Sequence, residues 1–401
     1  MNRKKDATIY YGLIIGTYSI GYVTMSAFSS VYLLDAGLSN GAIGMLLSIG
    51  SLLSVLLQPI VGAMIDRSEK VSSKRFLLLA GIIVAFLGAF IVFIPNTSIP
   101  VKTLMYGTEI MILMLSQPFL NSLGMDAVNY GYPMNFGVGK AMGSLGYALG
   151  SFAFGRISVM VGPKSVPIAF SIAFLVFCFL VTIYPVRTEG KESIETKIDN
   201  KVDSEVGVNW REEDKTPFLF RYKRFSGLLI GLILIYFSHS IINTFALQIV
   251  TPKGGTSADM GTASAIAAIC EMITTVCFVF IMKKVSIKTL LRVSGLFFAL
   301  KILFSLLAPN VFVFYLIQGF QVFGWGLMAV GIVYYVNSLV GEHDKARGQA
   351  YAGMAYTIAS VIATFVGGYI IDLFGINTLL LGGTILAILG TAILWIFIED
   401  V

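Results

Sequence analysis

Long apolar segments dominate this sequence and limit what the chain can fold into. Twelve runs reach the roughly 20 residues needed to cross about 30 Å of hydrocarbon. They lie near residues 8–34, 40–65, 75–95, 100–124, 138–161, 164–186, 225–250, 258–282, 287–307, 310–339, 346–371 and 376–398. In a bilayer only helices and closed barrels satisfy every backbone polar group. We therefore expect an all-α integral membrane protein with twelve transmembrane helices.

Composition excludes most other classes of protein. The chain is 56% hydrophobic and 12% charged, with a mean hydropathy of +0.84, which is too little polar surface for a soluble domain. Its three cysteines, Cys178, Cys270 and Cys277, lie inside apolar runs without disulfide or metal spacing. The net charge of +6 comes from residues scattered over short loops, so we expect no nucleic-acid partner. We expect no metal and no cofactor.

A polar segment divides the chain into two halves. Residues 187–223 are rich in Lys, Glu and Asp and are predicted to be a cytoplasmic linker between six-helix bundles at 1–186 and 224–401. With a cytoplasmic N-terminus, 22 of the 28 Lys and Arg residues fall in cytoplasmic segments. The positive-inside rule then predicts a multi-pass protein of the plasma (inner) membrane with both termini in the cytoplasm.

An internal repeat supports two related bundles. The pattern Gly139-Lys140-Ala141 to Tyr147 and Ser151 recurs 209 residues later, from Gly348-Gln349-Ala350 to Tyr356 and Ser360. Chance similarity between Gly- and Ala-rich helices is the alternative. Read as a helix, the first copy carries a glycine face and, one residue on, a polar stripe of Lys140, Ser144 and Tyr147. We expect this helix at the interface between the halves and the stripe on a cavity wall.

Charged groups inside the predicted spans are costly, at roughly 3 kcal/mol each, and so suggest function. Glu109, His239, Glu271 and Lys301 are candidates for proton coupling, with the proton as the coupling ion. We expect Glu271 and Lys301 to form an ion pair. Glu109 corresponds to Gln318 through the 209-residue offset, and we expect both to face a central cavity. The alternatives are a static salt bridge, a protonated carboxyl bonded to a neighbouring helix and a histidine that only packs.

The segment after the second span gives a family resemblance. Gly62-Ala63-Met64-Ile65-Asp66-Arg67, followed by Lys74-Arg75, resembles the signature loop of the major facilitator superfamily, with its second glycine missing and a longer loop. The resemblance implies two six-helix bundles related by pseudo-two-fold symmetry and transport by alternating access. It also implies that Gly62, Asp66, Arg67, Lys74 and Arg75 form a gate. A plain cytoplasmic turn is the alternative.

A narrower resemblance points to a branch of that superfamily. Gln58-Pro59-Ile60-Val61-Gly62, the stretch from Phe136 to Tyr147, and Glu271 resemble the lactose permease branch of oligosaccharide:proton symporters. The resemblance implies that Asp126 and Lys140 pair and hold a sugar. It places Tyr147 where a tryptophan stacks on the sugar ring and Glu271 where an acid accepts sugar hydroxyls. Packing alone is the alternative for Tyr147.

The sequence departs from that branch at its proton-coupling residues. Where the branch has an arginine, a histidine and a glutamate, this chain has Lys301, Gln321 and Gly324. Two further acid–base pairs are replaced by four uncharged residues, Asn243, Ala246, Gln318 and Tyr356. Both members of each pair are gone together, which avoids an unpaired buried charge. The fold implied by the resemblance survives this comparison, whereas the coupling chemistry does not.

These observations predict a monomeric carrier that imports a sugar or similar polyhydroxylated solute with a proton. Asp126, Lys140, Ser144, Tyr147, Asn243, Glu271, Gln318 and Gln321 are the predicted substrate ligands. A carrier for a nucleoside, an aromatic acid or an exported amphiphile is the first alternative. A membrane-embedded enzyme or a non-transporting sensor is the second, although the sequence contains no phosphate loop or clustered catalytic acid–base set.

Overall fold

A computed structural model describes residues 6–67, 72–95, 98–185, 217–341 and 344–399, and its regular elements are all helical. The first half contains α1 (Thr8–Ser26), α2 (Ser29–Asp35), α3 (Asn40–Arg67), α4 (Ser73–Ile91), α5 (Ile99–Asn129), α6 (Phe136–Val161) and α7 (Ser165–Ile183). The second half contains α9 (Phe218–Arg221), α10 (Lys223–Thr244), α11 (Ala246–Val250), α12 (Ser257–Met282), α13 (Ile287–Leu307), α14 (Val311–Gln318), α15 (Trp325–Leu339), α16 (Lys345–Phe374) and α17 (Ile376–Phe397). Short 3₁₀ turns, η1 (Thr251–Lys253) and η2 (Gly319–Val322), follow α11 and α14.

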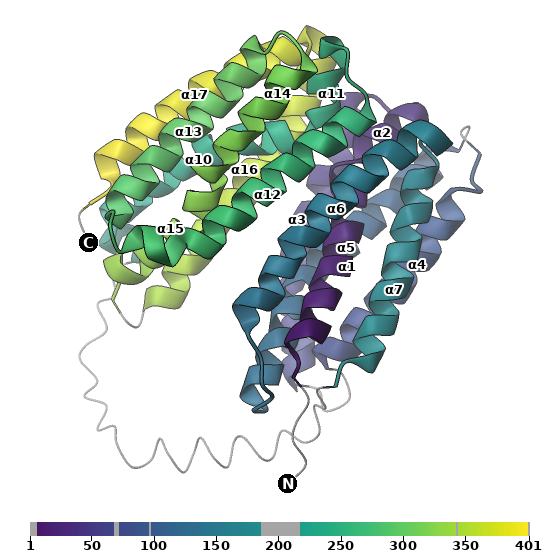
Figure 1. The fold of residues 1–401 in the computed structure, drawn as a ribbon, viewed down its shortest axis with the longest axis horizontal. Coiled ribbons are helices and arrows are strands. Elements are labelled where there is room, and N and C mark those ends of the chain that lie inside the picture. The colour runs from purple at the N-terminus through teal and green to yellow at the C-terminus, as the bar shows by residue number, and fades with distance from the viewer. Residues whose placement is uncertain (1–5, 68–71, 96–97, 186–216, 342–343, 400–401) are drawn as a thin grey trace.

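The predicted twelve spans correspond to these helices. Within the described residues, eleven helical segments are long and apolar enough to cross a membrane. The remaining span is the first in the chain, predicted at 8–34, and it is broken at Ala27–Phe28 into α1 and α2. Although α1 is less apolar than the eleven, it runs alongside them, packed on α6 and α7 (Figure 1).

The tenth span is interrupted inside the membrane. It consists of α14, η2 and α15, and carbonyl groups around the interruption are bonded by side chains of neighbouring helices. Ser294 Oγ donates to Gly324 O at 2.8 Å, and Thr274 Oγ1 donates to Val322 O at 3.1 Å. These hydroxyls meet the requirement that backbone groups freed from a transmembrane helix find other partners.

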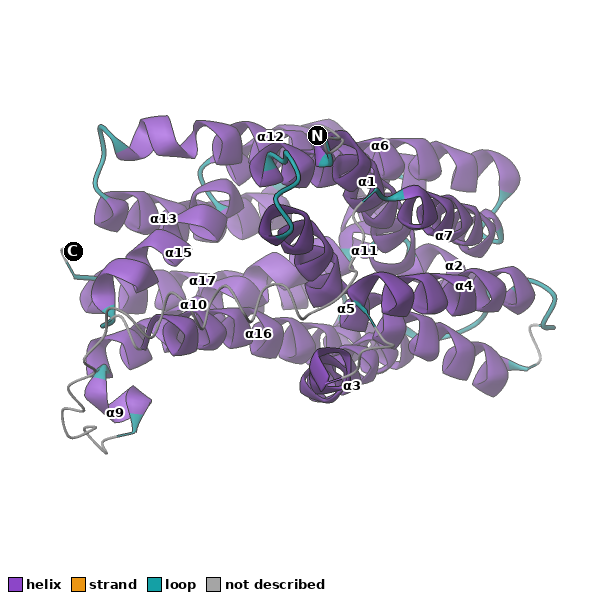
Figure 2. Ribbon diagram, turned by 90° about the horizontal axis from the view of Figure 1, so that it is seen from below, coloured by secondary structure: helices purple, strands orange, loops and turns teal. Residues whose placement is uncertain are grey.

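The two groups of helices spread apart towards one side of the molecule (Figure 1). We call this side, where α1 begins and α17 ends, the terminal face, and the other side the opposite face. Figure 2 shows the same two groups from below, with α9 near the C-terminal end of the second half. The predicted linker, 187–223, lies mostly outside the described residues, but its last part forms α9 and the beginning of α10.

On the opposite face the halves are in contact through α3 with α16 and α6 with α12. Glycines allow this close approach. A Cβ added to Gly44 would collide with the carbonyl oxygen of Thr364, and one added to Gly261 would collide with that of Ser151. The structure is therefore closed at the opposite face.

The glycine face of α6 packs mainly within its own half. Gly139, Gly143 and Gly146 pack against α1 of the same half, where an added Cβ would meet Tyr11, Ile15 and Gly16. Contact with the other half is made further along α6, where Gly155 lies against Ser257 and Gly261 of α12. The glycines at 139–146 thus hold α1 and α6 together, while α6 itself lies at the interface between the halves, as predicted, through its contact with α12.

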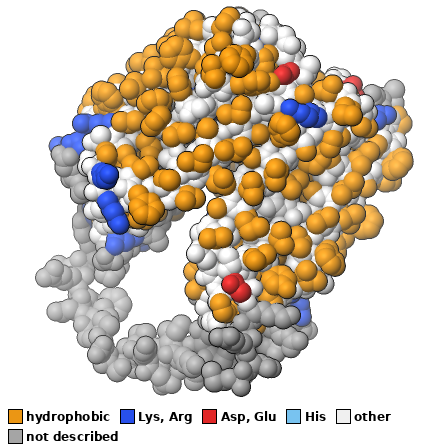
Figure 3. Space-filling view, in the orientation of Figure 1, with side chains coloured by type: hydrophobic (Ala, Val, Ile, Leu, Met, Phe, Trp, Pro, Cys, Tyr) orange, Lys and Arg blue, Asp and Glu red, His pale blue; other side chains and the backbone are white. Residues whose placement is uncertain are grey.

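On the face drawn in Figure 3, apolar side chains cover much of both groups of helices, and most Lys and Arg side chains lie towards the edges. Among the exposed residues, Met160 is 83% exposed and Phe93 is 80% exposed. A soluble protein rarely exposes so continuous an apolar surface. The surface is hollowed between the halves on the terminal side, consistent with the separation of the ribbons (Figure 3).

Candidate functional site: a cavity between the halves

A cavity of about 360 Å³ lies between the two halves. Its walls come from α1, α3, α5 and α6 of the first half and from α10, α12, α14, α15 and α16 of the second. This volume lies within the roughly 300–1,000 Å³ typical of small-molecule sites. A cavity with walls from both halves can change its access when the halves move relative to each other.

The second half provides the carboxylate. Glu271 of α12 is the one acidic residue among the described residues that line the cavity, and it lies beside the side chains of Gln321 and Trp325. The Trp325 indole stacks on the His239 ring, with centroids 4.5 Å apart and planes 5° apart. His239 Nε2 lies 2.9 Å from Asn243 Nδ2, one turn along α10. A carboxylate, amides and flat aromatic faces are therefore presented together on this wall.

Lys301 lies behind this wall, and its predicted ion pair with Glu271 is absent from the structure. The Lys301 side chain is 2% exposed, and its Nζ donates to Gln321 Oε1 at 2.6 Å. Since Gln321 also lies beside Glu271, the amide stands between the cation and the carboxylate. The prediction failed because an amide reaches from α14–α15 into the space between α12 and α13, a contact that sequence spacing does not reveal.

The first half supplies aromatic and hydroxyl groups. Tyr22 of α1 and Tyr147 of α6 lie next to each other on the cavity wall, with ring centroids 6.5 Å apart. Tyr18 lies one turn before Tyr22 and also lines the cavity. Ser144, one turn before Tyr147, also lines the cavity. Tyr356, which matches Tyr147 through the 209-residue repeat, lines it from α16. The structure thus brings Ser144, Tyr147, Asn243, Glu271, Gln318 and Gln321 together as predicted neighbours of one cavity.

Asp126 and Lys140 do not line the cavity and do not form the predicted pair. Lys140 Nζ donates to Asn121 Oδ1 at 2.5 Å and lies 5.8 Å from the centre of the Phe136 ring. Asn121 and Asp126 are five residues apart on α5, so they point about 140° apart around the helix. Lys140 faces the side of Asn121, which explains why the acid is not its partner.

Glu109 does not face the cavity either. The next residue, Ile110, lines it, while Glu109 is 0% exposed and turned into the first half. Its repeat mate Gln318 does line the cavity, so the expectation that both face it was wrong for Glu109. A rotation of 100° between neighbouring helical residues places the carboxyl behind the wall.

The predicted gate is only partly within the described residues. Residues 68–71 and the side chains of Asp66 and Arg67 lie outside them. Lys74 Nζ donates to the carbonyls of Thr182 and Tyr184 at 3.2 and 2.9 Å, and so caps the end of α7 in its own half. A Cβ added to Gly62 would meet no atom within 4 Å. With the halves apart on this face, the gating role of Gly62, Asp66, Arg67, Lys74 and Arg75 stays a prediction.

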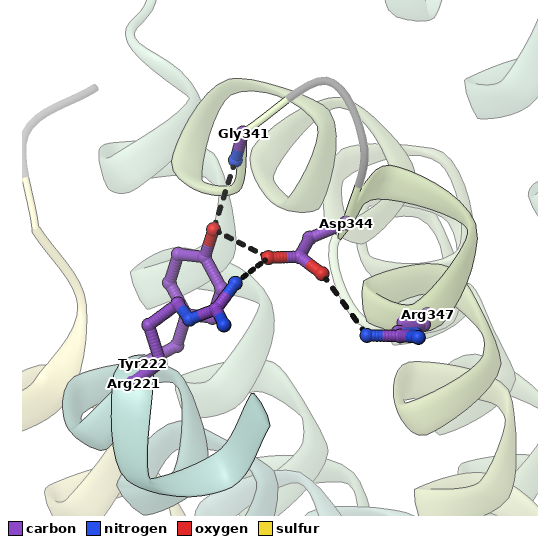
Figure 4. Close-up of polar contacts among 5 residues, drawn as sticks. All are labelled: Arg221, Tyr222, Gly341, Asp344 and Arg347. Atoms are coloured by element: carbon purple, nitrogen blue, oxygen red, sulfur yellow. Dashed lines mark hydrogen bonds and ion pairs between the residues drawn. The ribbon is translucent and has the colours of Figure 1, made fainter. Parts of the chain in front are cut away.

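On the terminal face of the second half, a buried acid fastens α9 to the start of α16 (Figure 4). Asp344 accepts hydrogen bonds from Arg221 Nη1 and from Tyr222 Oη, both at 3.0 Å. Arg347 Nη1 lies 3.7 Å from the other carboxyl oxygen, and Tyr222 Oη accepts from the Gly341 N–H at 3.1 Å. This network joins the end of the predicted linker to a helix that lines the cavity.

Several lining residues were not predicted. Tyr18, Ser19, Tyr22 and Ser26 of α1 share a helical stripe, with spacings of four and seven residues that the sequence already contains. Trp325 gives no such signal because it follows the interruption in the tenth span. Gln248 does not line the cavity and bonds to Ser30 and Asn40 at the opposite face. Among the described residues, no group of three His, Cys, Asp or Glu could hold a metal ion.

Comparison with known proteins agrees with this architecture. The maltose permease of Geobacillus stearothermophilus is 24% identical over 399 residues, covering 98% of this chain and 94% of that protein. The nucleoside transporter NupG has a similar structure, with a TM-score of 0.78, 13% identity and coverage of 98% of this chain and 100% of NupG. A D-xylose-proton symporter has a TM-score of 0.70 at 14% identity, with 98% of both chains covered.

The family follows from a match across most of the sequence. A family model described as the MFS_1-like family matches residues 16–381. The structural similarities establish the same all-helical fold, and the family consists of transporters rather than enzymes. The chain therefore belongs to the MFS_1-like family of the major facilitator superfamily.

Proposed function

We propose that this protein imports a sugar or a similar polyhydroxylated solute together with a proton, by alternating access of the central cavity. The observation that carries the proposal is the cavity lining, in which one carboxylate, several amides and several aromatic rings converge from both halves. Sugars present apolar C–H faces and hydroxyl edges, so rings and hydrogen-bonding groups together match them. The maltose permease named above supports the same substrate class.

In this proposal the two walls have different tasks. Glu271 accepts hydrogen bonds from sugar hydroxyls, and Asn243, Gln318 and Gln321 provide uncharged donors and acceptors. Tyr147 packs against a C–H face of the ring. Since Asp126 and Lys140 lie outside the cavity, they act at its terminal entrance rather than in the binding site. The two halves of one chain enclose the whole cavity, which fits a monomeric carrier.

The proton binds at Glu271 in this proposal. A proton on the carboxyl removes its charge and so weakens its attraction to the Lys301 ammonium group. Gln321 transmits this change because it contacts both groups. With the terminal face in the cytoplasm of a plasma (inner) membrane, as the Lys and Arg distribution indicates, the described conformation is open to the inside.

A nucleoside is the second candidate substrate. Four tyrosines and a tryptophan line the cavity: Tyr18, Tyr22, Tyr147, Tyr356 and Trp325. Such rings stack on nucleobases as readily as on sugars. The cavity therefore suits a ribose with an attached base as well as a disaccharide.

Uptake into proteoliposomes separates these possibilities. We expect accumulation of a radiolabelled disaccharide or pentose, with alkalinisation of the external medium, and loss of binding in Glu271→Gln. Asp35→Asn, which changes an exposed acid outside the cavity, is the matched control and should transport normally. Uptake of uridine alone would favour the second candidate. Accumulation of sugar without proton movement would remove proton coupling from the proposal.

A further inference from the structure

One buried acid of the first half has no role in the cavity described above. Glu109 is 0% exposed, and neither carboxyl oxygen has a hydrogen-bond partner among the described residues. It shares a face of α5 with Lys102, Tyr106 and Leu113, at spacings of seven, three and four residues. This face packs inside the first half, where Tyr106 Oη donates to the carbonyl of Met25 at 2.9 Å.

The surroundings of Glu109 require the carboxyl to be neutral. The nearby tyrosine hydroxyls are already used, since that of Tyr106 bonds to Met25 and that of Tyr32 donates to the carbonyl of Ile91 at 3.4 Å. An ionised carboxylate at membrane depth costs about 3 kcal/mol even on insertion scales, and more where nothing compensates it. We conclude that Glu109 holds a proton in this conformation.

The charged and titratable groups around Glu109 lie in the direction of the opposite face. Tyr106 and Tyr32 lie near the carboxyl, and their rings stack with centroids 6.1 Å apart. Lys102 Nζ lies 5.7 Å from the centre of the Tyr32 ring, with Asp35 close to both residues. Glu109 is ten residues from the start of α5 at the opposite face, or about 15 Å.

The other helices that pack around this site add no competing charge near it. Apart from α2, the helices with the most extensive contacts to α5 are α1, α3 and α4. Within the described part of the chain, α3 has no titratable side chain before Asp66, and α4 has none after Lys74 and Arg75 at its terminal end. The titratable groups in the second half of α1 are Tyr18 and Tyr22. Lys164, at the start of α7, lies near Lys102.

The same short helix that covers Glu109 also touches the other half. Tyr32 belongs to α2, which has seven residues and follows the break in the first span. Two residues earlier, Ser30 Oγ accepts a hydrogen bond from Gln248 Nε2 of α11 at 3.0 Å. Separation of the halves at the opposite face must break this bond. The loss of the bond removes a restraint on α2, which covers the Glu109 carboxyl.

We infer that Glu109 is a proton-binding site filled from the opposite face, and that its proton must be bound before this face can close. In the open state, water that enters along Tyr32 and Tyr106 exchanges protons with the carboxyl. A carboxylate that has lost its proton to this water is too costly to bury again in the apolar interior. The opposite face therefore closes only after Glu109 has bound a proton from the solution on that side. The inference rests on the proposed alternating access but not on the transported proton, which we assign to Glu271.

The test is downhill solute uptake by uniformly oriented proteoliposomes, with the pH varied on the opposite face and fixed on the terminal face. In the wild type the uptake rate should fall by up to about tenfold for each pH unit above the titration point of the site. Glu109→Gln is permanently neutral and similar in shape, so its rate should fall less steeply with this pH than the wild-type rate, and the dependence that remains belongs to the proton bound at Glu271. Glu399→Gln is the control and should keep the wild-type profile, because Glu399 pairs with Arg224 Nε at 2.7 Å on the terminal face, far from this path.

A profile in Glu109→Gln that matches the wild type, or a wild-type rate that does not depend on opposite-face pH, would overturn the inference. If Glu109→Gln does not fold, infrared spectroscopy of the wild type decides, because the C=O band of a protonated carboxyl must persist at neutral pH. Its loss at neutral pH, with the fold intact, would overturn the inference. Downhill uptake is measured whether or not protons accompany the solute, so failure of proton coupling is detected separately.

Discussion

A carboxylate of one half caps a helix of the other half, and its removal should open the opposite face. Asp372, near the end of α16, accepts hydrogen bonds from the Asn40 N–H at 3.1 Å and from the Gly41 N–H at 2.6 Å, at the start of α3. It also accepts from Asn40 Nδ2 at 2.9 Å. The Asn40 side chain in turn accepts from Gln248 Nε2 at 2.8 Å. One residue of the first half therefore joins α16 and α11 of the second.

The size of the effect can be worked out from these contacts. Loss of an N-terminal cap costs about 1 kcal/mol, and the charge-assisted bond to the Asn40 amide adds a similar amount at this exposed position. Both contributions exist only while the opposite face is closed. Asp372→Ala should therefore shift the equilibrium towards the state open at that face by about 2 kcal/mol, or roughly 30-fold. A minor state at about 1% would rise to roughly a quarter of the molecules.

The assay is electron–electron distance measurement between spin labels on opposite-face residues of the two halves. Val161 and Phe312 are suitable positions because they are 72% and 66% exposed and take no part in the cap. Asp372→Ala should increase the fraction of molecules with a long distance between the labels. Asn310→Ala is the matched control, since Asn310 caps α14 within one half by accepting from the Val313 N–H at 3.0 Å. A distance distribution unchanged in Asp372→Ala would refute the reasoning.

Three further changes test other parts of the structure. Gly261→Ala places a methyl group against the Ser151 carbonyl and should raise thiol labelling at the opposite face, whereas Gly382→Ala, with nothing within 4 Å, should not. Trp325→Ala removes an aromatic face and should weaken solute binding by about 0.5–1.5 kcal/mol, roughly 2- to 12-fold, in calorimetric titration. Lys301→Met leaves Gln321 Oε1 without its donor and should lower the unfolding free energy by about 1–3 kcal/mol in denaturant unfolding.

The sequence predicted the fold because the signals that define it are local. Apolar runs of membrane-spanning length, separated by short polar loops, need no knowledge of tertiary contacts. The 209-residue repeat predicted the pairing of Tyr147 with Tyr356, and both line the cavity. Breaks within spans were missed, since the hydroxyls of Ser294 and Thr274 that satisfy the freed carbonyls come from other helices.

Charge pairing was predicted poorly for a physical reason. Asp126 was paired with Lys140 through the family resemblance, and Glu271 with Lys301 by charge and position along the chain. In the structure Asn121 and Gln321 bind the two lysines instead. An amide can accept from an ammonium group at lower desolvation cost than a carboxylate, because only one charge is buried. Opposite charges on neighbouring helices are thus a weak guide to contacts when amides are within reach.

The contacts that close the opposite face are individually weak, which suits a carrier. Among the described residues the ion pairs Arg221–Asp344, Arg224–Glu399 and Arg347–Asp344 all lie within the second half, and none crosses between the halves. Closure depends instead on close glycine contacts and on hydrogen bonds such as Ser48–Thr364 at 2.6 Å and Ser158–Ser257 at 2.8 Å. Each such bond contributes about 1 kcal/mol. A solute or a proton, which can shift an equilibrium only by a few kcal/mol, can then move the protein between its two states.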